Sequence, residues 1–187
     1  MKRLVLPLVL FAMLTACSPP LRDEAGGRES GAFHLACYNA AGRLKWSETA
    51  HNALADEGEQ LFLNVVLRGG TAPANTYLRL YNTTPEETST LAGIAAYEPS
   101  GNGYSPQALP SSSSGWLSLA LDSGDYMATS VTKTFTASGG TIGPVTHLVL
   151  ATSSDNSGKL VSYAALSTTR TLADGDSLQV TYRLKMQ

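Results

Sequence analysis

The final residues of the chain alternate apolar and polar side chains so regularly that they can form little other than an antiparallel β-strand. Between Leu178 and Leu184 every second residue is apolar, and the residues between them are polar. A period of two with one apolar face is typical of a strand that lies half-buried on a core. Two more apolar runs, 145–151 and 160–166, precede this strand, and polar turns separate the three runs. We therefore predict three neighbouring strands whose shared apolar face the upstream chain must cover.

Short runs with the composition of strands recur through the upstream chain, with turn residues between them. The expected strands are 33–38, 44–48, 77–81, 116–121 and 127–136. The first two flank Asn39-Ala40-Ala41-Gly42, a segment suited to a hairpin turn. Many short strands predict a mainly β fold, an antiparallel β-sandwich of the jelly-roll kind. A length of 187 residues suits one such domain with a sizeable core.

One segment, 57–68, has helical spacing and is expected to form the one short α-helix of the fold. Its apolar stripe consists of Leu61, Phe62, Val65 and Val66. This spacing places the stripe on one side of a helix. Asp56 is expected to cap the start of the helix, and Gly69 with Gly70 to end it. We expect the stripe to pack on the sheet, and the alternative is a helix that binds a partner.

The start of the chain has the composition of a bacterial secretory signal. Lys2 and Arg3 supply positive charge, an apolar run follows, and Leu14-Thr15-Ala16-Cys17 matches the lipobox of bacterial lipoproteins. In this interpretation Cys17 is lipidated and becomes the mature N-terminus. Ser18 then favours the outer membrane. The alternative is an apolar N-terminus that arises by chance.

These patterns predict three parts of unequal length. Residues 1–17 are expected to be a lipoprotein-type signal peptide and residues 18–31 a flexible tether, because the latter combine proline, glycine and charge without periodicity. Residues 32–187 are expected to form the β-sandwich domain. The chain would then meet a membrane only through lipid on Cys17.

No group of side chains has the spacing of a catalytic, cofactor-binding or metal site. His34, His51 and His147 lie in separate segments, without the paired spacing of zinc ligands. Cys37 is expected to be a small buried apolar residue, and the alternative is a nucleophile activated by a nearby histidine. We therefore predict no catalytic residue, no cofactor and no metal.

Other classes of function have equally little support in the sequence. Segments 155–158 and 174–176 are rich in oxygen ligands that calcium could use, but they have the composition of hairpin turns. A net charge of -2 gives no electrostatic case for nucleic-acid binding. The enzymatic alternative is a hydrolase whose catalytic carboxylates come from positions that are distant in the sequence.

The segment 92–115 is long, polar and rich in glycine, proline and serine, and it is predicted to be a loop. Loops of this length inside a compact domain are usually functional or disordered. Tyr97 and Tyr104 are the candidate interface residues of this loop, because tyrosine is enriched at interfaces. The alternative is that both tyrosines pack onto the core.

A series of short motifs resembles a family of small structural proteins of tailed bacteriophages and prophages, assigned to the virion or its tail. The motifs are Cys37–Glu48, His51-Asn52, Gly69-Gly70, Tyr77–Leu80, Thr134–Thr136 and Gly175–Leu178. The resemblance covers residues 31–187. Residues 1–30 depart from it, because such proteins begin near the first strand and carry no lipobox.

The resemblance implies a non-enzymatic virion protein that contributes protein–protein interfaces. Its expected partners are other virion proteins, and the alternative is a second copy of the same chain in a homo-oligomer. The alternative is an outer-membrane lipoprotein, anchored through Cys17, whose β-sandwich binds a partner or a glycan.

Overall fold

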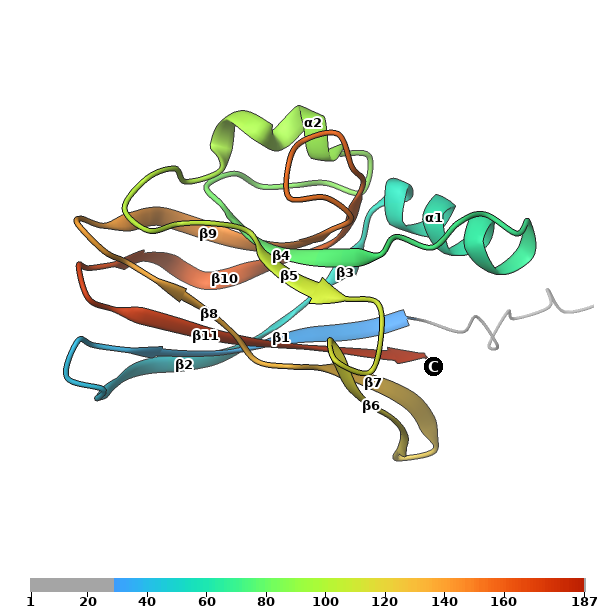
Figure 1. Cartoon of the computed structure of the whole chain (residues 1–187), viewed down its shortest axis with the longest axis horizontal. Helices are drawn as coiled ribbons and strands as arrows, with labels where there is room; N and C mark the ends of the chain where they lie inside the picture. The colour runs from blue at the N-terminus through green and yellow to red at the C-terminus, as the bar shows by residue number, and fades with distance from the viewer. Residues whose placement is uncertain (1–28, 187) are drawn as a thin grey trace, which may run out of the picture.

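The structure of the chain, a computed structural model, describes residues 29–186 as two antiparallel sheets packed face to face (Figure 1). The first sheet contains β1 (Glu29–Tyr38), β2 (Leu44–His51), β6 (Trp116–Asp122), β7 (Asp125–Ser130), β8 (Lys133–Thr136) and β11 (Ser177–Met186). The second contains β3 (Ala53–Leu54), β4 (Asn75–Tyr81), β5 (Gln107–Pro110), β9 (Ile142–Ala151) and β10 (Leu160–Leu172). The predicted mainly β sandwich is confirmed.

The order of strands places the C-terminal strand in the middle of the first sheet. This sheet has the order β2-β1-β11-β7-β6, and β8 also pairs with β11. The second sheet has the order β3-β10-β9-β4-β5. The last three predicted strands therefore form, but β11 joins the first sheet while β9 and β10 pair in the second. They meet through the core between the sheets instead of forming one sheet.

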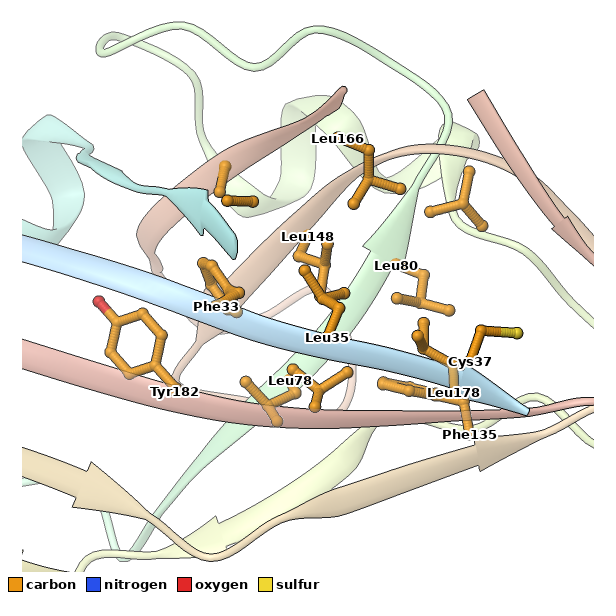
Figure 2. Close-up of a cluster of buried hydrophobic side chains, with 14 of the residues drawn as sticks. Phe33, Leu35, Cys37, Leu78, Leu80, Phe135, Leu148, Leu166, Leu178 and Tyr182 are labelled. Carbon is orange, nitrogen blue, oxygen red and sulfur yellow. The ribbon is translucent and has the colours of Figure 1, made fainter. Parts of the chain in front are cut away.

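The core lies between β1 and β11 on one side and the second sheet on the other (Figure 2). Phe33 lies opposite Tyr182 in the strand register, with ring centroids 4.6 Å apart, and Cys37 lies opposite Leu178. All four side chains are at most 2% exposed. The alternation in both strands therefore points apolar residues inward, as predicted, and Cys37 is a buried free thiol inside this core.

The predicted hairpin turn connects β1 to β2. Asn39 Oδ1 accepts hydrogen bonds from the backbone N–H groups of Ala41 at 3.1 Å and Arg43 at 2.9 Å. Gly42 has a φ of 73°, a left-handed conformation that favours glycine. This turn brings Lys45 at the start of β2 beside the turn that precedes β11.

Lys45 forms an ion pair with Asp176, which is 3% exposed. Burial acts to raise the pKa of the Asp176 carboxyl, but the 2.5 Å hydrogen bond from Lys45 Nζ and the bond from the Ala173 N–H outweigh it. The pKa is thus held below its ordinary value. Because the carboxyl has a lower pKa in the folded state, its contribution to stability is complete above the unfolded-state pKa. That contribution is lost as the pH falls through the folded-state pKa.

We expect the melting temperature of the wild-type chain to fall as the pH is lowered from neutral to below about 4, near the ordinary pKa of aspartate. Asp176→Asn should show a smaller fall over the same interval, because the titrating carboxyl is gone. Thermal melts followed by circular dichroism at each pH measure this difference. Glu59→Gln, at an exposed position, is the control and should keep the wild-type profile. Identical profiles for Asp176→Asn and wild type would refute the role of this ion pair.

Helix α1 (Asp56–Leu67) follows β3 directly. The N-cap is Ala55, so the prediction that Asp56 caps the helix is wrong. The physical reason is that β3 continues into the cap: the Ala55 N–H donates to the Val161 carbonyl of β10. The predicted end is confirmed, because Gly69 has a φ of 68° and the Gly70 N–H donates to the Asn64 carbonyl at 2.9 Å.

Gly58 lets α1 approach β10 closely. A Cβ atom at this position would lie 2.2 Å from the Val161 carbonyl oxygen, so the helix or the strand would have to shift. In a helix that makes no such contact, Gly→Ala stabilises by about 1 kcal/mol. Here we expect Gly58→Ala to destabilise by roughly 1–3 kcal/mol, as overpacking does.

Urea denaturation of Gly58→Ala measures this change in the free energy of unfolding. Asn64→Ala, at an exposed position of the same helix, is the matched control and should be neutral or slightly stabilising. A gain in stability for Gly58→Ala would show that α1 does not pack on β10 in this way.

The segment predicted as one long loop contains regular structure, which corrects that prediction. Helix α2 (Leu91–Ile94), the 3-10 helix η1 (Ala95–Tyr97) and β5 lie within or beside it. Leu91 and Ile94 are buried against the outer face of the second sheet, where they pack with residues such as Val149. A helix of four residues is too short to show a helical period, so the sequence pattern predicted only one helix.

Candidate interaction surface

The β6–β7 hairpin projects from the end of the first sheet (Figure 1). Along β6 every residue after Trp116 is exposed. Leu117, Leu119 and Leu121 are 66%, 74% and 64% exposed, and Tyr126 on β7 is 57% exposed. Leu121 lies opposite Tyr126 in the register, and Leu119 is two residues from Leu121, so these three side chains share one side of the hairpin. Leu117 precedes them where the pairing with β7 shifts between Trp116 and Ser118. We call these four residues the leucine face.

The leucine face continues the inner, core-facing side of the first sheet. Leu119 lies opposite Ala128, and Ala128 lies opposite Leu184 on β11. Leu184 is two residues beyond the buried Tyr182, so it points to the same side of the sheet. The inner face of the sheet therefore runs past the packed core and becomes solvent-exposed on β6 and β7.

Helix α1 contributes a second set of exposed apolar side chains at this end of the sandwich. Leu63, Val66 and Leu67 are 58%, 73% and 73% exposed, and Phe62 is 37% exposed. The predicted packing of the whole stripe on the sheet is therefore only partly right. The N-terminal part of α1 packs on β10, and the rest of the helix projects past the sheet (Figure 1).

A groove of about 270 Å³ joins the helix to the first sheet, and we call it the apolar groove. Its lining is almost entirely apolar and comes from α1, the following segment and both sheets. The lining residues are Leu61, Phe62, Val65, Ala72, Pro73, Thr76, Ser111, Trp116, Ala128, Leu150, Val161 and Leu184. None of the described residues that line it is ionisable, so its chemistry suits an apolar partner surface.

The two tyrosines predicted as interface residues lie in different environments. Tyr104 points inward, where its hydroxyl donates to Glu98 Oε1 at 2.5 Å and accepts from the Leu80 N–H at 3.1 Å. Its ring stacks on Phe135, and burial followed by the nearby Glu98 charge raises the pKa of the Tyr104 hydroxyl. Tyr97, in contrast, is 52% exposed at the end of η1. Tyr97 is thus the more accessible of the two, and the interface role of both tyrosines stays a prediction.

Arg79 on β4 is the largest fully buried side chain of the described residues, at 1% exposure. Its guanidinium pairs with both carboxylate oxygens of Glu98. It also donates to the Asp155 carbonyl at 2.6 Å and to Asn156 Oδ1 at 2.8 Å. Arg79 therefore ties the segment after η1 to the loop between β9 and β10. The residue pattern does not indicate this role, because arginine in an alternating strand usually faces solvent.

The histidines and the cysteine named in the sequence do not come together. His34 pairs with Thr49 on the first sheet, His51 is exposed at the end of β2, and His147 is buried on β9 in the second sheet. Cys37 lies in the core, where burial raises the pKa of its thiol. Across residues 29–186 no three His, Cys, Asp or Glu side chains are grouped closely enough to hold a metal ion.

The oxygens of the two oxygen-rich turns are engaged by groups of the protein. Asp155 Oδ1 accepts from the hydroxyls of Ser153 and Ser157 at 2.6 Å each. Together these bonds hold the pKa of the Asp155 carboxyl at about 2. In the other turn Asp176 pairs with Lys45. The first turn thus closes on itself as hairpin turns do, whereas the second is tied to β2 through Lys45.

The predicted lipidation site, Cys17, lies outside the described residues, as do the predicted signal peptide and most of the tether. Lipidation therefore stays a prediction. Within the part of the chain that the structure describes, no helix is both long and apolar enough to cross a membrane. β1 begins at Glu29, slightly upstream of the predicted domain start at Ala32.

Comparison with known proteins gives one family. The family model described as podophage GP4 fiber I protein gp80 matches residues 53–183. This range runs from β3 into β11 and contains α1, the apolar groove and the leucine face. None of the curated proteins matches the chain. The match extends over more than half of the 187 residues, and the chain belongs to the podophage GP4 fiber I protein gp80 family, a family of phage structural proteins.

Proposed function

We propose that this chain is a non-enzymatic component of a podophage fibre and that it binds other virion proteins through the apolar groove and the leucine face. The observation that carries the proposal is the exposure of large apolar side chains from α1 and from the β6–β7 hairpin at one end of the sandwich. Monomeric proteins rarely expose apolar patches beyond about 300–600 Å². A surface of this kind is covered when the chain takes its place in an assembly.

The ionisable side chains of the described residues support a structural role, because the most buried of them are engaged in packing contacts. Arg79 pairs with Glu98, and Lys45 pairs with Asp176. Glu48 on β2 pairs with Arg170 on β10 at 2.7 Å and so links the two sheets. These charges hold elements together, and none lines the apolar groove.

Assembly of phage particles with variant chains tests this proposal. Phage that lack the gene are grown in cells that supply the wild-type chain, Val66→Lys or Leu121→Lys, and particles are purified on a density gradient. Both variants place a charge at an exposed position, so they should keep the wild-type melting temperature. We expect their amount per particle to fall by roughly tenfold or more, because a buried charge at an interface costs over about 1.4 kcal/mol.

Leu44→Lys is the matched control, since Leu44 is 56% exposed on β2, at the opposite edge of the first sheet. Particles should contain this variant at the wild-type level. Equal amounts of all four chains in the particles would contradict the assignment of the interface to this end of the sandwich.

A further inference from the structure

The outer edge of β6 differs from the other sheet edges among the described residues. β6 has seven residues, and its first charged residue is Asp122 at the end of the strand. Its pairing with β7 is irregular at one place, between Trp116 and Ser118, and is regular from Ser118 to Asp122. The other edges are short, charged or interrupted: β3 has two residues, and β5 ends in Pro110. β8 carries Lys133, and β2 carries Lys45 and Glu48. Sheet proteins normally blunt an edge with such features, and a long apolar edge without them tends to pair with another strand.

The sequence of β6 is complementary to itself in the antiparallel direction. When Leu119 lies opposite Leu119 of a second copy, Ser118 lies opposite Ala120, and Leu121 faces the irregular position of Leu117. Facing residues in an antiparallel pair point to the same side of the sheet, so leucine meets leucine on one side and small residues meet on the other. An interface that repeats itself in this way has two-fold symmetry.

The charges near β6 do not oppose this pairing. Asp122 and Asp125 at the hairpin tip both lie near Lys185 Nζ, at 3.6 and 3.5 Å. Lys185 thereby offsets acidic charge at the tip, and in the antiparallel pair Asp122 lies opposite Trp116 of the other copy, so the two tips lie at opposite ends of the paired strands. Residues 111–121 contain no charged side chain, so the centre of the pair holds no like charges.

The leucine face supplies part of the area that a stable pair requires. Its four large side chains are between 57% and 74% exposed. At roughly 100 Å² for each, they present on the order of 400 Å², about half of the area that each partner buries in a standard interface.

We propose that two copies of this chain pair through the edges of β6, antiparallel and centred on Leu119, so that the two first sheets form one continuous sheet. The inference deepens the proposed fibre function and rests on it, because it names a second copy as one partner at this surface. The leucines of the two copies pack side by side, and the unpaired backbone groups of each β6 edge hydrogen-bond with those of the other.

Sedimentation velocity of the full chain over a range of concentrations tests the pairing. The wild-type chain should form dimers. Leu119→Lys should weaken the dimer by roughly 100-fold or more, since two leucines leave the interface and two like charges face each other. Leu44→Lys, an exposed leucine at the opposite edge of the same sheet, is the control and should dimerise as the wild type does.

A cysteine cross-link tests the register without depending on affinity. Leu119→Cys in a Cys17→Ser background should form disulfide-linked dimers under mild oxidation. Facing residues in an antiparallel pair have Cα atoms about 4.5–5.5 Å apart, within the range that a disulfide spans. Leu44→Cys in the same background should stay monomeric on a non-reducing gel.

Three results would overturn the pairing: a wild-type chain that is monomeric at all concentrations, a dimer that Leu119→Lys leaves intact, or a higher oligomer without two-fold symmetry. In a monomer the surface would be covered by residues 1–28 or by a different virion protein. Failure of the pairing and failure of the fibre function are distinguishable. A monomeric chain that is present in purified particles refutes only the pairing, whereas a chain absent from particles refutes the fibre function whatever its oligomeric state.

Discussion

A chain that ends before Ser177 is expected to lose cooperative folding. This truncation removes β11, which lies at the centre of the first sheet and pairs with β1, β7 and β8. Leu178, Val180 and Tyr182 on this strand are at most 2% exposed. Truncation of one such side chain costs about 2–5 kcal/mol, and a whole domain has a stability of about 5–15 kcal/mol. The truncated chain should show no thermal transition by circular dichroism.

Arg183→Ala is the control for this experiment, because Arg183 lies on the same strand with its side chain exposed. Substitutions at such surface positions usually change stability by no more than about 0.5 kcal/mol. A truncated chain that melts at the wild-type temperature would mean that the core does not depend on β11.

Arg79→Met is expected to lower the free energy of unfolding by about 3–5 kcal/mol, the usual cost of breaking a buried ion pair. The substitution leaves the Glu98 carboxylate, whose side chain is 14% exposed, without its guanidinium partner. It also removes the hydrogen bonds to Asp155 and Asn156 that hold the loop between β9 and β10. Urea denaturation measures the loss.

The double variant Arg79→Met, Glu98→Gln shows whether the loss comes from the unpaired charge. It should be more stable than Arg79→Met alone, because no uncompensated carboxylate remains. Arg43→Met, an exposed arginine in the β1–β2 turn, is the control and should be nearly neutral. A loss below about 1 kcal/mol for Arg79→Met would show that the buried cluster is not a main support of the fold.

Much of the fold could be predicted because its strands alternate strictly. The alternation at Phe33, Leu35 and Cys37 matches that of β11 residue by residue, and both strands face the core. The turn at Asn39 and Gly42 could likewise be predicted from the sequence, because its residue types suit the conformations that it adopts. What alternation leaves open is which strands share a sheet, since that depends on contacts between distant segments.

The interaction surface was harder to predict, for a physical reason that β6 illustrates. Alternation at Leu117, Leu119 and Leu121 indicates that one side of the strand is apolar, but the same pattern appears whether that side is covered or exposed. The neighbouring sheet decides between these outcomes, and on β6 the side is exposed. The helical stripe of α1 behaves in the same way, since Leu61 lines the groove whereas Val66 faces solvent.

Arg79 and Tyr104 show the opposite case, in which residues typical of a surface reach inward, Arg79 fully and Tyr104 in part. Both depend on Glu98, which accepts hydrogen bonds from each of them. A polar residue can be buried when such a partner reaches it, and that partner is not visible from local sequence. The prediction of Tyr104 as an interface residue rested on residue type and loop length alone.

The location of the chain in an infected culture tests the central claim, that it is a structural protein of podophage particles, most directly. Particles are purified through a density gradient after growth with labelled fatty acid, and the chain is measured by mass spectrometry in the particle and membrane fractions. We expect the chain to follow infectious particles through the gradient at a constant ratio to the major capsid protein. Recovery only in the bacterial outer membrane, with label on Cys17 and none of the chain in particles, would contradict it.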